Sequence, residues 1–181
     1  MQATFYRTVK PLLEDDSAPT VTTYSANKSH EREIVGPILS LDLGTKRVGT
    51  AVSDPSLIAI TRIGTLDRAS WKQLLRDVSD LVRRFDAKTL VIGFPLSLDG
   101  TEGSAATAAR ETALKFARSL ELSVYLQDER LTSREAEEQL RADGYQTKEV
   151  AALVDSESAA IILRDFIAAG QQRTLIERPL D

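Results

Sequence analysis

Residues 38–54 read ILSLDLGTKRVGTAVSD, and this stretch predicts two strands joined by a tight turn. Residues 38–43 are typical of a buried strand, residues 44–47 carry turn chemistry, and residues 48–53 are expected to return beside the first strand. Asp42 lies inside the first apolar run. An ionised carboxylate in a protein core raises the free energy of the folded state unless it is paired or binds a metal. The position of Asp42 inside an apolar strand therefore requires an explanation.

Two roles are open for Asp42. Its side chain could hydrogen-bond the backbone of the turn that follows, as Asp commonly does in tight turns. Alternatively, its carboxylate could belong to a metal or phosphate site. The positions of other carboxylates in the sequence bear on this choice.

The composition of the 181-residue chain excludes several kinds of site. There is no Cys, and His30 is the only His, which argues against thiol nucleophiles, disulfides, Cys/His zinc sites and Ser-His triads. Catalysis would have to use carboxylates, Lys, Arg, hydroxyl groups or a hard cation. The net charge of -4 argues against coating nucleic acid by bulk positive charge, but it is compatible with a local basic face.

We expect one domain between two less regular segments. Residues 1–36 are polar and lack a sustained period, which predicts a flexible N-terminal extension. The domain would cover residues 37–170, and residues 171–181 would form a C-terminal tail. No apolar run approaches the ~20 residues of a membrane span, and no signal-peptide pattern is present, so we expect a cytoplasmic protein with no membrane partner.

Short apolar runs predict three further strands, at residues 58–65, 89–93 and 123–127. The first would complete a three-stranded antiparallel meander, and the second has the composition of a strand covered on both faces. Alternation of these strands with helices predicts an α/β domain with a mixed sheet. Ligands of such sheets gather at the carboxyl ends of the strands.

Apolar stripes and capping signals predict helices at residues 71–85, 104–120 and 132–144, and a last helix that follows a loop at 145–148 and ends at Gly170. The inward-facing residues expected of the second helix are Ala105, Ala109, Phe116 and Leu120. The expected buried stripe of the last helix consists of Ala159, Ile162, Leu163, Phe166 and Ile167. Backbone amides of the loop at 94–103 could face a phosphate.

Two further carboxylates are predicted near Asp42. Glu129 follows the strand at 123–127, and Asp155 lies one turn before Ala159 on the stripe that faces the sheet. Converging carboxylates repel one another, and bound Mg²⁺ or Mn²⁺ would relieve the repulsion because these hard cations take carboxylate oxygens. Two such ions about 3.5 to 4 Å apart could clamp the attacking and leaving oxygens of a phosphodiester bond.

Each carboxylate also has a purely structural explanation. Glu129 could pair with Arg130 or Arg134 at the surface, and Asp155 could cap its helix. One shared site accounts for all three positions together, whereas the structural explanation needs three separate roles. The sequence pattern therefore favours the metal site.

Four blocks of the sequence resemble the YqgF family of RNase H-like nucleases. They read LDLGTKRVGTAVSD, VIGFPLSLDGTEGSAA, DERLTSREA and VDSESAAIIL, and the resemblance covers roughly residues 37–170. Members of the family are described as candidate pre-16S rRNA processing nucleases or as Holliday junction resolvase-like proteins. The resemblance implies an RNase H-like fold, hydrolysis that depends on Mg²⁺ or Mn²⁺, and catalytic, metal-binding carboxylates at Asp42, Glu129 and Asp155.

The resemblance also implies a nucleic-acid partner. The residues expected to hold its phosphate backbone are Lys46, Arg47, Arg130 and Arg134. We expect processing of the 5′ end of pre-16S rRNA in ribosome biogenesis, by a monomer or a homodimer. A DNA endonuclease that resolves junctions and a non-catalytic assembly factor that binds nucleic acid are the alternatives.

One rival interpretation comes from the opening block alone. Asp-Leu-Gly-Thr, followed by Gly49, also resembles the first phosphate-binding motif of the actin, chaperone and sugar-kinase ATPases. That architecture closes two RNase H-like domains on a nucleotide. A chain with one domain of this size has no second half to close the cleft, so the nuclease interpretation is preferred.

Overall fold

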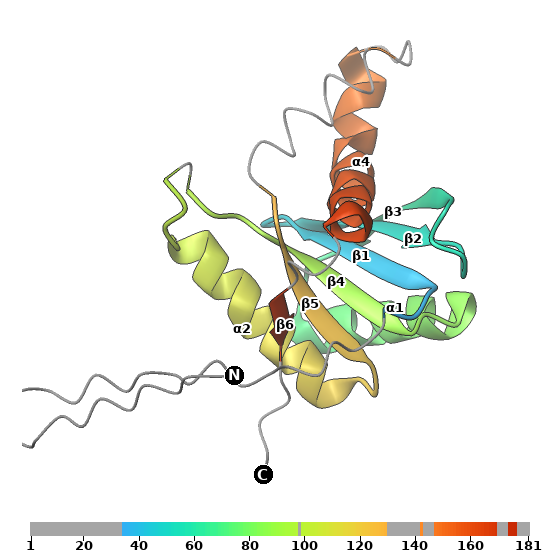
Figure 1. The fold of residues 1–181 in the computed structure, drawn as a ribbon. Coiled ribbons are helices and arrows are strands. Elements are labelled where there is room, and N and C mark those ends of the chain that lie inside the picture. Colours follow the sequence, from blue (N-terminus) through green and yellow to red (C-terminus); the bar gives the residue numbers. More distant parts are fainter. Residues whose placement is uncertain (1–33, 98, 130–141, 143–146, 170–173, 177–181) are drawn as a thin grey trace, which may run out of the picture. The chain divides into compact units, whose positions relative to one another are not determined.

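A computed structural model of the chain describes residues 34–97, 99–129, 142, 147–169 and 174–176 (Figure 1). The elements in this part of the chain are β1 (Ile38–Leu43), β2 (Arg47–Ser53), β3 (Ile60–Asp67), α1 (Trp71–Phe85), β4 (Thr89–Phe94), α2 (Ser104–Ser119), β5 (Ser123–Asp128), α4 (Thr147–Ala168) and β6 (Thr174–Ile176). The helix predicted at residues 132–144 lies, apart from residue 142, outside the described residues. Of the helices described, none is long and apolar enough to cross a membrane.

The strands form one six-stranded sheet in the order β3-β2-β1-β4-β5-β6. The first three strands pair as an antiparallel meander, β4 pairs parallel to β1, β5 pairs parallel to β4, and β6 is antiparallel to β5. The predicted mixed sheet is confirmed. Because β1, β4 and β5 run in the same direction, their carboxyl ends meet at one end of the sheet.

Helices cover both faces of the sheet, with α1 and α2 on one face and α4 on the other (Figure 1). Successive side chains of a strand point to opposite faces, so each inner strand contributes to two cores. In β1, Leu39 and Leu41 belong to the core under α1 and α2, whereas Ile38 belongs to the core under α4. The same alternation places Asp42 on the face that α4 covers.

The ends of α1 follow from local sequence. The hydroxyl of Ser70 accepts a hydrogen bond from the backbone N–H of Gln73 at 3.2 Å and caps the start of the helix. Asp86 ends the helix in a left-handed conformation with φ 51°. The buried face of α1 consists of Leu74, Val78 and Leu81.

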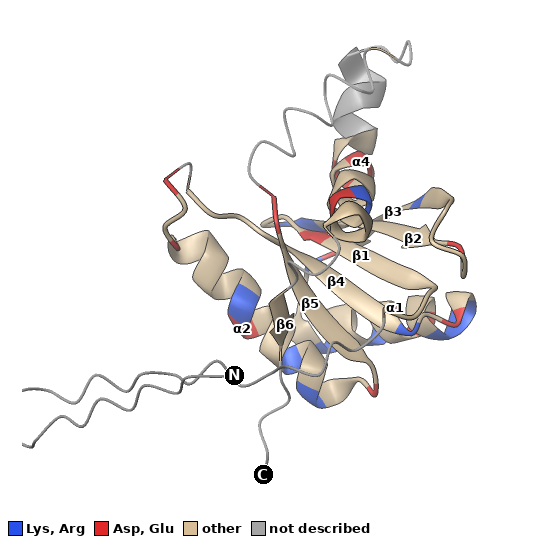
Figure 2. Ribbon diagram, in the orientation of Figure 1, with Lys and Arg blue, Asp and Glu red and all other residues tan. Residues whose placement is uncertain are grey.

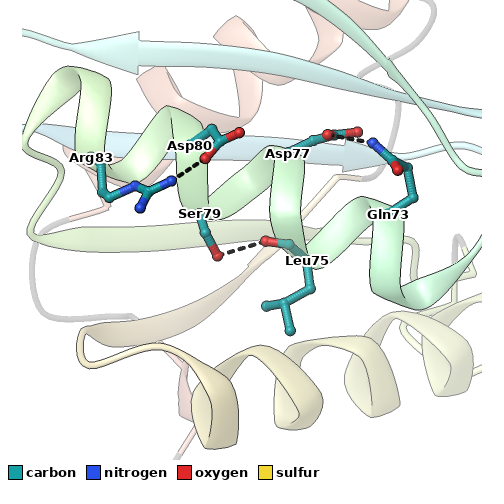
Figure 3. Close-up of polar contacts among 6 residues, drawn as sticks. All are labelled: Gln73, Leu75, Asp77, Ser79, Asp80 and Arg83. Carbon is teal, nitrogen blue, oxygen red and sulfur yellow. Dashed lines mark hydrogen bonds and ion pairs between the residues drawn. The ribbon is translucent and has the colours of Figure 1, made fainter.

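The polar side of α1 carries short-range contacts between residues one turn apart (Figure 3). They join Gln73 to Asp77, Ser79 to the carbonyl oxygen of Leu75, and Arg83 to Asp80. The two side-chain pairs, Gln73–Asp77 and Arg83–Asp80, stabilise a helix by about 0.2–0.5 kcal/mol each, whereas the Ser79 hydroxyl bonds back to the helix backbone. The buried apolar face, at ~1.5–3 kcal/mol for each buried aliphatic side chain, therefore holds α1 on the sheet.

Several predicted details are corrected by the structure. In α2, the predicted Ala109, Phe116 and Leu120 are buried, but Ala105 is exposed and its neighbour Ala106 is buried instead. β3 begins at Ile60 rather than residue 58, since the Asp54 carboxylate accepts backbone hydrogen bonds from residues 56, 58 and 59 and holds them in a loop. α4 already includes Thr147 and the residue after it, so the loop predicted at residues 145–148 is wrong there.

The segments that flank the domain are described only in part. Residues 1–33 of the predicted extension and most of the predicted tail lie outside the described residues. Within the tail, Thr174–Ile176 forms β6 and buries Ile176 against the core under α1 and α2. No sequence signal predicted this short edge strand.

Candidate active site

Asp42 lies near the carboxyl end of β1 and faces α4. Burial, and then the negative charge of Asp155, raise the pKa of the Asp42 carboxyl to about 6. A hydrogen bond from the side chain of Ser158 on α4 acts in the opposite direction and lowers this pKa. The carboxylate of Asp42 is therefore directed across the layer toward α4.

Gly49 of β2 allows α4 to come close to Asp42. Gly49 is the cross-strand partner of Asp42 in the β1–β2 ladder. A Cβ atom added to Gly49 would lie 1.8 Å from the backbone oxygen of Asp155, so a larger residue would push the backbone of α4 away. Glycine at this position brings Asp155 next to Asp42.

A partly buried ion pair links α4 to β3. Nη1 of Arg62, on β3, lies 2.8 Å from Oε2 of Glu157, whose side chain is only 7% exposed. Glu157 is two residues beyond Asp155 on the same helix. The Arg62 side chain is 32% exposed, but because the Glu157 side chain is nearly buried, losing its cationic partner would be unfavourable, so this contact favours one orientation of the helix.

Glu129 directly follows β5 and lies over Gly93 of β4. A Cβ atom added to Gly93 would lie 2.4 Å from Oε2 of Glu129 and 2.7 Å from Cδ1 of Ile162. Burial, and then the negative charges of Asp42 and Asp128, raise the pKa of the Glu129 carboxyl to about 8. Gly93 thus provides the space in which this carboxylate is held beneath α4.

The two glycines lie on either side of Asp42. Gly49 pairs with Asp42 on one side, and the parallel pairing of Leu41 with Ile92 places Gly93 at the next position on the other side. Gly49, Asp42 and Gly93 therefore lie side by side across β2, β1 and β4, and the Asp42 carboxylate has no side chain beside it on either neighbouring strand. This row leaves room for Glu129 above one glycine and for the backbone of α4 above the other.

Asp155 is partly balanced by a cation. Nε of Arg47 lies 2.9 Å from Oδ2 of Asp155, and the two side chains are 48% and 25% exposed. Arg47 begins β2, and strand alternation places it on the same face as Gly49. The sequence predicted that Arg47 contacts phosphates, and the structure places its guanidinium at the margin of the carboxylates.

The predicted carboxylates come from three distant segments, and the structure brings Glu129 and Asp155 into electrostatic contact with Asp42. Within the described part of the chain, no three Asp, Glu or His side chains are grouped so that they could hold a metal ion as they stand. Lys46 is exposed on the turn after β1. Arg130 and Arg134 lie outside the described residues. In Figure 2, acidic positions mark the end of β5 and the part of α4 that lies on the sheet.

Sequence reasoning missed three residues that shape this site. Ser158 lies three residues after Asp155, a spacing that brings two helix residues to one face, and this signal could have identified it. Gly93 interrupts a continuous apolar strand, which indicates a close approach by another group. Asp128 raises the pKa of Glu129, and its position beside Glu129 was the only indication of that effect.

Comparisons with known proteins match the same part of the chain. A family model described as Holliday junction resolvase, RuvX, matches residues 36–169. A protein of Anaeromyxobacter sp. (strain K) is 39% identical over 129 residues, which cover 71% of this chain and 94% of that relative. A protein of Gloeothece citriformis (strain PCC 7424) is 40% identical over 139 residues, covering 77% of this chain and 92% of the relative. Both relatives are named as candidate pre-16S rRNA nucleases.

Among solved structures, T. thermophilus RuvC in complex with Holliday junction substrate has a similar fold. The TM-score is 0.51, with 13% sequence identity, and the match covers 77% of this chain and 98% of the other. At this identity the similarity shows the fold alone, and it confirms the predicted RNase H-like architecture. The family model and the relatives span most of the chain, so the resemblance of the four sequence blocks is confirmed and the chain belongs to the RuvX family.

Proposed function

We propose that this protein is a cytoplasmic nuclease that uses divalent metal ions to hydrolyse phosphodiester bonds, and that it processes the 5′ end of pre-16S rRNA. One observation carries the proposal: Asp42 and Glu129 are partly buried carboxyls whose pKa values are raised by burial and by neighbouring carboxylates, Asp155 for Asp42 and Asp42 for Glu129. Carboxylates so placed are unfavourable for folding and belong to the groups that functional sites commonly contain.

The donor set fits Mg²⁺ or Mn²⁺. Asp42, Glu129 and Asp155 offer hard carboxylate oxygens, and a cation would remove the cost of ionising the two buried groups. These three residues would hold the metal after their side chains move closer together, because among the described residues they do not form a ready-made metal site. When bound, the metal would supply an activated water at neutral pH and stabilise the charge that develops on the phosphate.

The protein's own residues would position the reacting groups. Ser158 hydrogen-bonds the Asp42 side chain and orients its carboxylate. Arg47 balances the charge of Asp155 and is exposed enough to contact a phosphate. Lys46, on the exposed turn beside it, would neutralise a neighbouring phosphate.

RNA is proposed as the substrate because relatives with about 40% identity over most of the domain are named for pre-16S rRNA. A four-way DNA junction is the second candidate, and the description of the family model favours it. Hydrolysis of a phosphodiester bond by bound metal ions does not itself require a 2′-hydroxyl group. The choice between the two substrates therefore has to be made by cleavage.

The test is side-by-side cleavage of an RNA carrying the 5′ end of pre-16S rRNA and of a four-way DNA junction, with Mg²⁺, with Mn²⁺ and in excess EDTA. We expect cleavage of the RNA only with metal, and a loss of orders of magnitude in Asp42→Asn. Asp80→Asn on the exposed side of α1 is the matched control and should retain activity. Undiminished cleavage in EDTA would contradict the metal mechanism, and cleavage of the junction alone would favour the second candidate.

A further inference from the structure

A separate cavity lies between α1 and α2, with a volume of about 210 Å³. Its lining consists of Arg68, Ser70, Trp71, Leu74, Thr112 and Lys115. None of these residues belongs to the carboxylate site. Arg68 nevertheless connects the cavity to the carboxylate site, because it contacts the turn that follows Asp42.

Two cationic side chains border the cavity. Nη1 of Arg68 donates a hydrogen bond to the backbone oxygen of Gly44 at 2.8 Å, and its backbone N–H donates to the oxygen of Lys46 at 2.9 Å. Lys115 projects from α2 and is exposed. Among the residues that the structure describes, neither cation forms an ion pair with a carboxylate. Both charges are therefore available to an anion.

Trp71 supplies an aromatic wall. Its ring packs against Phe116 at a centroid distance of 4.8 Å and an interplanar angle of 60°, and the residue is only partly buried. Nζ of Lys115 lies 5.9 Å from the ring centroid. A partly open aromatic ring beside cations is the combination that single-stranded nucleic-acid sites use, because bases stack on the ring and phosphates contact the cations.

We propose that this cavity binds one nucleotide of a single-stranded RNA, with its phosphate between Arg68 and Lys115 and its base against Trp71. The proposal rests on the proposed nuclease function, and the nucleotide would belong to the strand that passes the carboxylates. The cavity volume of about 210 Å³ is below the ~300–1,000 Å³ of pockets for drug-sized ligands, so the cavity suits a single nucleotide rather than a longer segment of RNA.

The geometry also selects a class of substrate. A duplex offers phosphates to Arg68 and Lys115, but its bases are stacked and paired and have no free face for Trp71. An unpaired base can enter the cavity. The cavity would therefore bind a single-stranded RNA end in preference to a duplex or a four-way junction.

Trp71 is the only Trp in the chain, so its fluorescence reports on this cavity alone. The experiment titrates the full-length protein with a single-stranded RNA oligonucleotide in EDTA, and it follows both Trp emission and the anisotropy of an end label. We expect the two signals to change with the same midpoint. Lys115→Ala should weaken binding several-fold at low salt and lower the slope of log affinity against log salt by about one.

The matched control is Arg118→Ala, which removes an equal charge three residues further along α2 from a residue that does not line the cavity. It should leave the midpoint and the salt slope unchanged. Both side chains are exposed, so both variants should fold, and a thermal melt checks this. Equal effects of the two substitutions would overturn the proposal, as would RNA binding that leaves Trp emission unchanged.

Duplex RNA and a four-way junction provide the last comparison. They should bind with little change in Trp emission, and quenching as strong as that by single-stranded RNA would overturn the base contact. Because the titrations contain EDTA, they do not depend on cleavage. If single-stranded RNA quenches the Trp emission of the wild-type protein but is not cleaved with Mg²⁺, the nuclease function alone is contradicted. If the RNA is cleaved but does not quench the emission, this binding site alone is contradicted.

Discussion

Glu129 is the residue with the largest departure from ordinary acid–base behaviour at the site. Its pKa is raised from 4.5 to about 8, mainly by burial. A raised pKa means that the folded state binds the proton more tightly than the unfolded state. The favourable contribution is therefore complete below pH 4.5 and is lost as the pH rises through about 8.

Glu129→Gln removes this titration and should become increasingly more stable than the wild type as the pH rises from 5 to 9. At pH 5 the wild-type carboxyl is largely neutral, like Gln, and at pH 9 it is ionised in a partly buried position. Thermal melts in EDTA at several pH values measure the difference. Glu111→Gln, exposed on α2, is the control and should give a curve parallel to the wild type. A difference that does not change with pH would contradict the raised pKa.

Arg47→Ala should affect binding far more than stability. The ion pair with Asp155 is partly exposed, and such pairs contribute only ~0–1 kcal/mol to folding. Loss of a phosphate contact, in contrast, should lower the salt slope of RNA binding by about one. Arg83→Ala removes an Arg that is also in an exposed ion pair, with Asp80 on α1, and serves as the control. Identical salt slopes for the two variants would exclude Arg47 from the RNA contact.

At the level of elements, periodicity predicted most of the architecture. β1, β2 and α4 have strong apolar patterns because they are buried, and stepping back one turn from Ala159 located Asp155. Chain order then placed Glu129 at the carboxyl end of β5. These predictions need only local spacing, which the sequence contains in full.

What the sequence could not provide depends on contacts between distant segments. The approach of α4 to Gly49 is a property of two elements more than 100 positions apart. β6 has only three residues, which is too short for a period to be recognised. The burial of Ala106 rather than Ala105 at the start of α2 reflects how that helix packs, since a small residue fits the pattern at either position.

The two glycines beside Asp42 provide matched substitutions that test how α4 packs on the sheet. Gly49→Ala would place Cβ 1.8 Å from a backbone oxygen of α4, which can be relieved only by moving the helix. Overpacking of this kind typically costs about 1–3 kcal/mol. Gly93→Ala would instead meet the ends of the Glu129 and Ile162 side chains, which can move more easily.

We therefore expect Gly49→Ala to affect mainly stability and Gly93→Ala to affect mainly cleavage. Gly49→Ala should lower the melting temperature clearly and increase hydrogen exchange in α4. Gly93→Ala should lose less stability but should lower the rate of cleavage, because it displaces the Glu129 carboxylate. A Gly49→Ala protein with the stability of the wild type would contradict the close packing of α4 on β2.

On the scale of the whole molecule, an acidic chain with net charge -4 has to bind a polyanion. Basic and acidic positions both occur along α1, α2 and α4, whereas the end of β5 is marked by acidic positions (Figure 2). RNA would therefore be repelled by the carboxylate site until cations reduce its charge. Metal binding and RNA binding should accordingly support each other, and metal binding alone should be visible as a change in the stability of the domain.

Mg²⁺ should raise the melting temperature of the wild type more than that of Asp42→Asn. A ligand that binds only the folded state stabilises it by about 2.7 kcal/mol when its concentration is a hundred times its Kd. Each kcal/mol raises the melting temperature of a domain near 150 residues by roughly 2–4 °C. In EDTA at pH 7.5, by contrast, the melting temperature of Asp42→Asn should be higher than that of the wild type. Because the pKa of Asp42 is raised to about 6, its charged form costs stability above that pH, and Asn has no such cost. Melts with and without Mg²⁺ at constant ionic strength measure both effects, and equal Mg²⁺ shifts for the two proteins would remove Asp42 from the metal site.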